Sequence, residues 1–286
     1  MKKRNSCMVG LLLLIIFSSV TCSSNNSMTT ERDIKKNAYL EGENVKGLKE
    51  TELVGKIKNH ATKINLAASD AVLDKSNWEL VAKEKPGISV NVEKTLGALL
   101  NAKEGTKVNL IVEKTMPPVT SENLNNNIVE IGKFTTTLLD KKLSRVNNIE
   151  LSSDWINNEK IAPGQEFSFN QTLGKRTKEK GYEKAPIIIK TKKGPKKGSG
   201  VGGGICQLSS TLYNAALMAG MEITERHSHS KGVGYVPLGQ DAAVSYGSVD
   251  FKFKNTRKFP VMIKVYLTNE QLTVTLLENR NVKKIA

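Results

Sequence analysis

The feature that most constrains the fold is a run of glycines followed by one cysteine and a helical pattern. Five glycines fall within the seven residues 198–204, and Cys206 comes shortly after them. Apolar residues then recur at steps of three or four as far as Gly220, which predicts a helix with one buried face that ends at this glycine. The apolar positions are Leu208, Leu212, Ala215, Ala216 and Ala219.

Cys206 is expected near the first turn of this helix, beneath a loop that has no side chains to obstruct access. Free backbone N–H groups and the positive end of the helix dipole favour an anion there, which lowers the pKa of a thiol and makes thiolate available. Glycines also allow the main chain of a substrate to approach closely. The same pattern fits a buried structural cysteine at a tight turn, and this stretch alone does not separate the two interpretations.

The N-terminal segment is organised like an export signal. Three basic residues follow Met1, and residues 8–20 form an apolar run. Because a membrane-spanning helix needs about 20 apolar residues, we interpret residues 1–22 as a signal peptide. Residues 19–22, Ser-Val-Thr-Cys, resemble a bacterial lipoprotein cleavage site, so Cys22 is the predicted lipidation site. Simple cleavage near Cys22 and an uncleaved anchor are the alternatives.

The charge and the cysteines fit a protein of the cell envelope. Lys and Arg total 43 against 28 Asp and Glu, and the formal net charge of +15 suits an anionic cell wall or membrane surface. With an export signal, nucleic acid is not the expected partner. Cys7 leaves with the signal and Cys22 is acylated or lost, so Cys206 remains without a disulfide partner. We expect a lipid-anchored protein at the outer face of the cytoplasmic membrane or in the cell wall, of unspecified oligomeric state.

The rest of the chain is expected to form a tether and two folded parts of class α+β. Residues 23–50 are polar and predict a flexible tether. Residues 51–119 predict a small α+β module, and after a boundary between 118 and 131, residues 131–280 predict a mixed, mainly β domain that holds the cysteine helix. Helices are expected over 51–67 and 91–100. Strands are expected near 78–82, 88–90, 108–112, 134–138, 185–189, 222–226, 235–237, 243–246, 250–254, 261–266 and 272–277, and an exposed hairpin tip near 190–199.

Candidate partners for the thiol follow the cysteine helix. Catalysis by cysteine needs a thiolate, a group that moves protons, a group that orients it, and donors for an oxyanion. His227 and His229 lie one residue apart at the end of a predicted strand, so both side chains should face the same side, and either could serve Cys206. Asp241 or Glu225 could orient an imidazole, and Arg226 could hold a carboxylate.

The backbone N–H groups of Cys206 and Gln207 are the expected oxyanion donors, since both residues lie at the start of the helix. The His-x-His pattern also occurs in metal sites, but no third and fourth ligands stand out in the sequence. We therefore expect neither a metal nor another cofactor. The histidine that does not serve the thiol is expected to form hydrogen bonds that fix the loop over residues 228–239.

Seven motifs occur in order within residues 132–260. They are PGQEFSFN (163–170), LGKRT (173–177), GYEKA (181–185), GGGICQLSSTLYNAA (202–216), ERHSHS (225–230), YVPLGQDA (235–242) and DFKFKN (250–255). Together they resemble the VanW family. Residues 51–119 resemble, in less detail, the peptidoglycan-binding module that often precedes a VanW domain. The main departure is the lysine-rich run at 192–197, which affects the expected shape of the loop that covers the site.

The resemblance implies a protein that acts on peptidoglycan. Family members with the GGGICQ motif have been proposed as L,D-transpeptidases, which implies Cys206 as the nucleophile. The family name comes from a glycopeptide-resistance cluster, and that association does not define a reaction. The implied partners are peptidoglycan stem peptides. The residues expected to contact substrate are Gly202, Gly203, Gly204, Gln207, Ser209, Arg226 and Tyr235.

We therefore expect a cysteine acyl-enzyme that forms 3-3 cross-links. Cys206 attacks the carbonyl of the third, diamino-acid residue of a stem tetrapeptide and expels the terminal D-Ala, while His229 or His227 moves the protons. Two alternatives stay open. One is a non-catalytic wall-binding lipoprotein in which Cys206 is structural, and the other is a cysteine peptidase that trims stem peptides with water as the acceptor.

Overall fold

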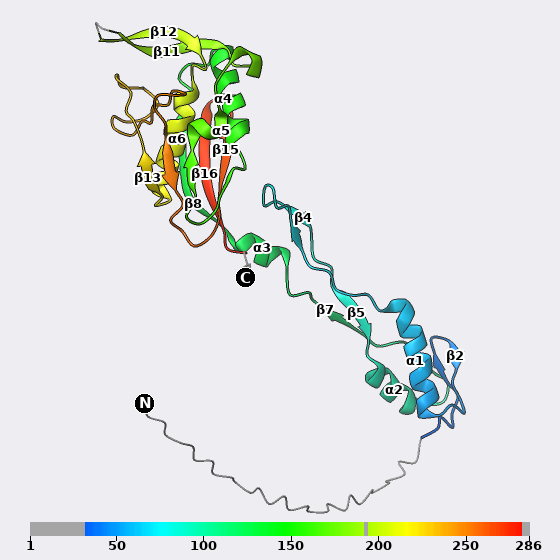
Figure 1. The fold of residues 1–286 in the computed structure, drawn as a ribbon. Coiled ribbons are helices and arrows are strands. Elements are labelled where there is room, and N and C mark those ends of the chain that lie inside the picture. Colours follow the sequence, from blue (N-terminus) through cyan, green and yellow to red (C-terminus); the bar gives the residue numbers. More distant parts are fainter. Residues whose placement is uncertain (1–31, 192–193, 282–286) are drawn as a thin grey trace, which may run out of the picture. The chain divides into compact units, whose positions relative to one another are not determined.

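The computed structural model describes residues 32–191 and 194–281 (Figure 1). The expected signal peptide, the lipidation site at Cys22 and the first part of the tether lie outside these residues. Within the described ranges, no helix is both long and apolar enough to cross a membrane. The chain forms two compact units, 32–64 with 90–113 and 65–89 with 114–281, so that 65–89 and 114–119 lie with the second unit and not with the first.

The first unit combines two helices with a small sheet. Helices α1 (Glu50–Ile64) and α2 (Val92–Leu100) pack on each other, and α2 contacts the sheet. Strand β1 (Ala38–Leu40) pairs antiparallel with β2 (Glu43–Asn44) and parallel with β6 (Thr106–Val108). Two helices that pack on each other beside a small sheet are consistent with the expected α+β class.

The expected tether is wrong for residues 32–50, which begin the first unit. Ile34, Leu40 and Val45 are buried in the same apolar cluster as the inner face of α1. The strands in this segment are only two or three residues long, and β1 pairs with a strand far along the chain. Because a pattern that short carries no periodicity, the sequence reads as a polar linker.

The helix expected over 91–100 is confirmed, because α2 begins after Asn91, whose side chain accepts a hydrogen bond of 2.8 Å from the Lys94 N–H. The strand expected over 108–112 is instead two strands, since β6 ends at Val108 and β7 (Val112–Thr115) pairs with β5 (Gly87–Val90). Likewise β4 (Leu80–Ala82) is shorter than expected. Trp78 precedes it with a φ of 60°, in the turn from β3 (Val72–Leu73).

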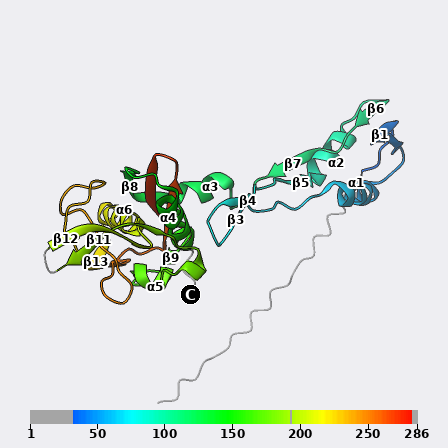
Figure 2. The ribbon, with the colours of Figure 1, turned by 90° about the horizontal axis from the view of Figure 1, so that it is seen from above.

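The second unit is built on a four-stranded antiparallel sheet of order β8-β16-β15-β9 (Figures 1 and 2). The hairpin of β15 (Val261–Leu267) and β16 (Gln271–Asn279) is confirmed, and β16 also pairs with β8 (Ile128–Thr137). Helix α6 (Ile205–Met218) packs on β8 and β16 and forms the core with them. The packing is close at Gly132, where a Cβ atom would lie 2.3 Å from the carbonyl oxygen of Ala215. The cysteine helix is therefore fixed against the sheet.

Helix α4 (Leu143–Ile156) also packs on this core, against β15 and α6, although strands and turns were expected from Gly132 onward. Its buried face includes Asn148, Ser152 and Ser153 besides Ile149 and Ile156. Polar residues on the inner face hide the helical repeat of apolar residues. The second unit is consequently richer in helix than the expected, mainly β domain, although its α+β class is confirmed.

A second sheet and a long hairpin complete the strands of this unit. Strands β10 (Glu166–Ser168), β14 (Lys252–Lys254) and β13 (Glu222–Glu225) form a second sheet, and β11 (Lys184–Thr191) pairs with β12 (Gly194–Val201) as a long hairpin. The glycine run is therefore partly strand, and only residues 202–204 form the turn into α6. The strands expected at 235–237 and 243–246 are loops. The remaining short elements are β9 (Lys160–Ile161), α3 (Ser121–Asn126), α5 (Phe169–Leu173) and η1 (Lys178–Lys180).

Candidate active site

Cys206 is the second residue of α6 and is half-buried. The chain enters the helix through Gly202 and Gly204, which have φ values of 82° and 110°, a region that favours glycine. Gly203 lies between them against β11, where a Cβ atom would come within 2.6 Å of the carbonyl oxygen of Ala185. The three glycines therefore allow a sharp turn that places Cys206 at the helix start, which is the position the sequence predicts.

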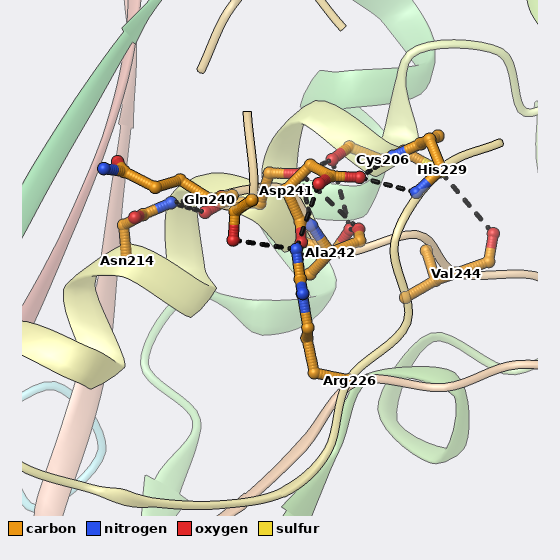
Figure 3. Close-up of polar contacts among 11 residues, drawn as sticks. Cys206, Asn214, Arg226, His229, Gln240, Asp241, Ala242 and Val244 are labelled. Carbon is orange, nitrogen blue, oxygen red and sulfur yellow. Dashed lines mark hydrogen bonds and ion pairs between the residues drawn. The ribbon is translucent and has the colours of Figure 1, made fainter. Parts of the chain in front are cut away.

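The thiol of Cys206 lies between a loop carbonyl and His229 (Figure 3). Its Sγ atom donates to the carbonyl oxygen of Val244 at 3.5 Å. Burial alone would raise the pKa of Cys206, but the hydrogen bond and positive charge of His229, with a smaller effect of Arg176, outweigh it and leave this pKa below its ordinary value. The environment therefore favours the thiolate.

His229 is held by Asp241. The Nδ1 atom of His229 and its backbone N–H both lie 2.6 Å from Oδ2 of Asp241. Since Nδ1 faces the carboxylate, Nε2 is the nitrogen left for the thiol. Burial lowers the pKa of His229, but the interactions with Cys206 and then Asp241 raise it above its ordinary value. Opposite shifts at sulfur and imidazole favour a thiolate–imidazolium pair.

Arg226 supports Asp241 from the side away from the imidazole (Figure 3). Its Nη2 atom lies 3.0 Å from Oδ1 of Asp241, and its Nε donates to the Asp241 carbonyl at 2.6 Å. Although burial opposes ionisation of Asp241, hydrogen bonds from His229 and the charges of His229 and Arg226 lower its pKa. The guanidinium also lies 5.3 Å from the ring centre of Tyr213 on α6. Arg226 thus positions the carboxylate through its Nε and Nη2 atoms.

His227 binds a different carboxylate from His229, and the expectation that both histidines face one side is wrong. Its Nε2 lies 3.0 Å from Oε1 of Glu225, and its side chain is 44% exposed against 10% for His229. Glu225 in turn binds Lys252 and accepts from the Asp250 N–H, which together with His227 lower the pKa of Glu225 to about 2. Strand β13 ends at Glu225, so the alternation of side chains in a strand does not extend to residues 227 and 229.

Gln207 and Ser209 have structural contacts in place of the expected substrate contacts. Gln207 is 1% exposed, accepts from Arg145 Nη2 at 2.8 Å, and donates to Thr136 and Thr137 at 3.0 Å. Ser209 is fully buried and donates to the Ala242 carbonyl at 2.6 Å. Both side chains therefore fix α6 to its neighbours and are not open to a ligand.

One of the two expected oxyanion donors is available. The N–H of Gln207 donates to the Gly204 carbonyl at 2.9 Å, so it is already used. The N–H of Cys206 has no acceptor within the described residues and lies at the positive end of α6.

Tyr235 lies beside the thiol. Burial raises the pKa of Tyr235, the charge on Cys206 raises it further, and a hydrogen bond with Ser210 acts in the opposite direction.

Two arginines near this site have no counterpart in the sequence-based expectations. Arg145 lies on the first turn of α4, and Arg176 lies between α5 and η1. The LGKRT motif contains Arg176, but a basic residue in a lysine-rich chain is not distinctive, and α4 was not predicted. What distinguishes them is a buried nitrogen without a hydrogen-bond acceptor on each, which only the structure reveals. No group of three or more His, Cys, Asp or Glu in the described ranges is arranged to hold a metal ion.

Comparison with known proteins places this site within a matched region. Residues 144–277 match the family model described as "VanW like protein". A Bacillus subtilis (strain 168) protein, described as "Uncharacterized protein YoaR", is 44% identical over 161 residues, which cover 56% of this chain and 52% of that protein. The "Vancomycin B-type resistance protein VanW" of Enterococcus faecalis (strain ATCC 700802 / V583) is 28% identical over 134 residues, 45% of this chain and 47% of that protein.

The chain thus spans about half the length of the curated relatives that it matches. No solved structure matches it. The matched region holds Cys206, His229 and Asp241, together with Arg145 and Arg176.

Proposed function

With residues 144–277 being a VanW-like domain, we propose that this protein acts on peptidoglycan as a cysteine-dependent L,D-transpeptidase. The observation that carries the proposal is the grouping of Cys206, His229 and Asp241, in which the thiol pKa is lowered and the imidazole pKa is raised. A nucleophile, a proton carrier and an orienting carboxylate in this order are the requirements of acyl transfer through cysteine. The resistance protein among the relatives is consistent with a role at the cell wall.

In the first step the thiolate of Cys206 attacks the carbonyl carbon of the third residue of a stem tetrapeptide. The oxyanion accepts a hydrogen bond from the Cys206 N–H. The imidazolium of His229 gives its proton to the nitrogen of the terminal D-Ala, the C–N bond breaks, and D-Ala leaves. The product is a thioester on Cys206 and a neutral His229.

In the second step the side-chain amine of a neighbouring stem attacks the thioester. His229 accepts the proton of this amine, the C–S bond breaks, and the thiolate is regenerated beside an imidazolium. The new amide joins the third residues of two stems, which is a 3-3 cross-link. Asp241 keeps Nδ1 protonated and the ring oriented through both steps.

The test is mass spectrometry of disaccharide-tetrapeptide after incubation with the full-length protein, with Cys206→Ser as the matched control. We expect release of D-Ala and formation of a 3-3 dimer with the wild type and neither with the control. Release without a dimer would identify water as the acceptor and favour the peptidase alternative. No release at all, with binding to isolated cell wall retained by both forms, would overturn the enzymatic proposal in favour of a wall-binding protein.

We also propose that the protein is exported and held at the membrane by lipid on Cys22. This proposal rests on the sequence of residues 1–22 and on the net charge, which suits an anionic envelope. Metabolic labelling with a fatty acid tests it. Label is expected on the wild type and not on Cys22→Ala, and an unlabelled wild-type protein would contradict it.

A further inference from the structure

Two arginines flank the glycine turn that leads to Cys206. A Cβ atom placed on Gly202 would lie 3.4 Å from Cβ of Arg176, and one placed on Gly204 would lie 3.0 Å from Cγ of Arg145. Both side chains therefore contact the turn, one from the loop after α5 and the other from α4. Side chains on these glycines would compete with both arginines for space.

Each of these arginines has a buried nitrogen without a partner. Nη1 of Arg176 donates to Oδ1 of Asn170 at 2.7 Å and to the Gly174 carbonyl at 3.2 Å, whereas Nη2 is buried and has no acceptor within the described residues. For Arg145, Nη2 donates to Gln207 at 2.8 Å, and the buried Nε has no acceptor there either. A buried N–H without an acceptor is destabilising and rare, so each needs an explanation.

Neither arginine has a carboxylate as an ion-pair partner, whereas every other arginine of the described chain has one. No ion pair within residues 32–191 and 194–281 involves Arg145 or Arg176. Asp250 is near enough to act on Arg176 by charge, but its oxygens accept from Ser168 Oγ at 2.6 Å and the Asn170 N–H at 2.8 Å. The paired arginines are Arg32 with Glu50, Arg226 with Asp241, and both Arg257 and Arg280 with Glu278.

Arg176 is held in place by Asn170, which is itself bound to the loop that follows Val244. The amide of Asn170 that orients Nη1 of Arg176 also donates to the carbonyls of Ser245 at 3.2 Å and Val249 at 2.8 Å, in the loop that follows the thiol acceptor Val244. The guanidinium lies 5.6 Å from the ring centre of Phe169. Its position is thus fixed before any ligand binds, which reduces the entropy cost of binding.

We propose that Arg176 and Arg145 form a carboxylate-binding site beside Cys206, which takes the free C-terminal carboxylate of the residue that the thiolate expels. This rests on the proposed acyl transfer and specifies its substrate class as peptides with a free C-terminal carboxylate that are cleaved one residue from their C-terminus. A carboxylate accepts charge-assisted hydrogen bonds from guanidinium N–H groups and supplies the acceptors that both arginines lack. In such a peptide the carboxylate lies one residue beyond the attacked carbonyl, so a site beside the thiol selects cleavage at that bond.

The test compares alkylation of Cys206 by iodoacetate, which carries a carboxylate, and by iodoacetamide, which is neutral and of similar size. Both reagents form one S–C bond and release iodide, and the extent is read by mass spectrometry on the peptide that contains Cys206, in the full-length protein. Relative to the same thiol in the denatured chain, the ratio of the iodoacetate rate to the iodoacetamide rate should rise about tenfold, because the arginines bind the reagent. Acetate should inhibit the iodoacetate reaction alone.

Arg176→Gln should reduce this ratio toward that of the denatured chain, and Arg280→Gln, the matched control, should leave it unchanged. If Arg176→Gln does not fold, Arg145→Gln carries the same prediction. A ratio that equals the denatured value in the wild type, or that neither substitution changes, would overturn the proposal.

A second arm separates this proposal from the proposed function. Stem tetrapeptide ending in D-Ala and the same peptide ending in D-alaninamide are compared as substrates, and the wild type should strongly prefer the free acid, with the preference lost in Arg176→Gln. If the protein cleaves neither peptide, the acyl-transfer proposal fails, while the alkylation ratio still decides whether the arginines bind a carboxylate.

Discussion

Two histidine–carboxylate pairs lie close together in the sequence, and they differ in burial and in the third group that joins them. His227 and Glu225 are 44% and 29% exposed and are joined by Lys252, whereas His229 and Asp241 are 10% and 11% exposed and are joined by the thiol of Cys206. Water and salt screen the first pair. In the second pair, exclusion of water strengthens each interaction. Burial and the third group, more than the pairing itself, separate a surface contact from a reactive centre.

Loss of His229 is the largest effect expected from this comparison. His229→Ala removes the group that stabilises the thiolate and protonates the leaving amine, so release of D-Ala from stem tetrapeptide should fall by about 10²–10⁴-fold, the usual range for general acid–base catalysis. Liquid chromatography of released D-Ala measures it. His227→Ala is the matched control and should retain the wild-type rate. Equal losses in both variants would remove the distinction between the two pairs.

Removing the charge of Asp241 should have an intermediate effect. Asp241 raises the pKa of His229, so Asp241→Asn should lower it and reduce the fraction of thiolate–imidazolium pair at neutral pH. A shift of one unit in pKa corresponds to about a tenfold change, so alkylation of Cys206 by iodoacetamide at pH 7 should slow by roughly tenfold. Glu225→Gln removes the carboxylate of the exposed pair and should leave this rate unchanged. A variant at Asp241 that reacts as fast as the wild type would show that the carboxylate does not act on the imidazole.

The smallest expected effect is on stability, and it comes from the exposed pair of His227 and Glu225. Glu225→Gln should lower the free energy of unfolding at pH 7 by about 0.5 kcal/mol, as for a surface ion pair. The pKa of Glu225 is lowered to about 2, so its contribution is present above the pKa of the unfolded chain and is lost as the pH falls toward 2. Urea unfolding at several pH values should show the gap between variant and wild type closing in acid. A gap that widens in acid would contradict this assignment.

Elements with local signals were predictable from the sequence. The helix with Cys206 follows from its apolar repeat and its glycines, α2 follows from the cap at Asn91, and the β15–β16 hairpin follows from alternation around a short turn. Cys206, His229 and Asp241 were named as candidates because their residue types suit acyl transfer. The structure brings these three together, and their catalytic role remains a proposal.

The features that escaped prediction depend on contacts between distant segments. Helix α4 buries Asn148, whose side chain bonds the carbonyls of Glu183 and Gly203, so a polar residue occupies a core position. Gln207 was expected to meet substrate, but its partners lie on β8 and α4. The separation of His227 from His229 depends on where β13 ends. None of these outcomes is encoded in spacing along the chain.

The pH dependence of Cys206 alkylation by iodoacetamide tests the central claim most directly, because the reagent reads the thiolate alone. In the full-length protein, followed on the peptide that contains Cys206, we predict an inflection below the value of about 8.5 for a free thiol. His229→Ala should move the inflection upward, His227→Ala should not, and denaturation should restore ordinary thiol behaviour. A Cys206 that stays unreactive until the protein is denatured would contradict the account and leave the thiol as a structural residue.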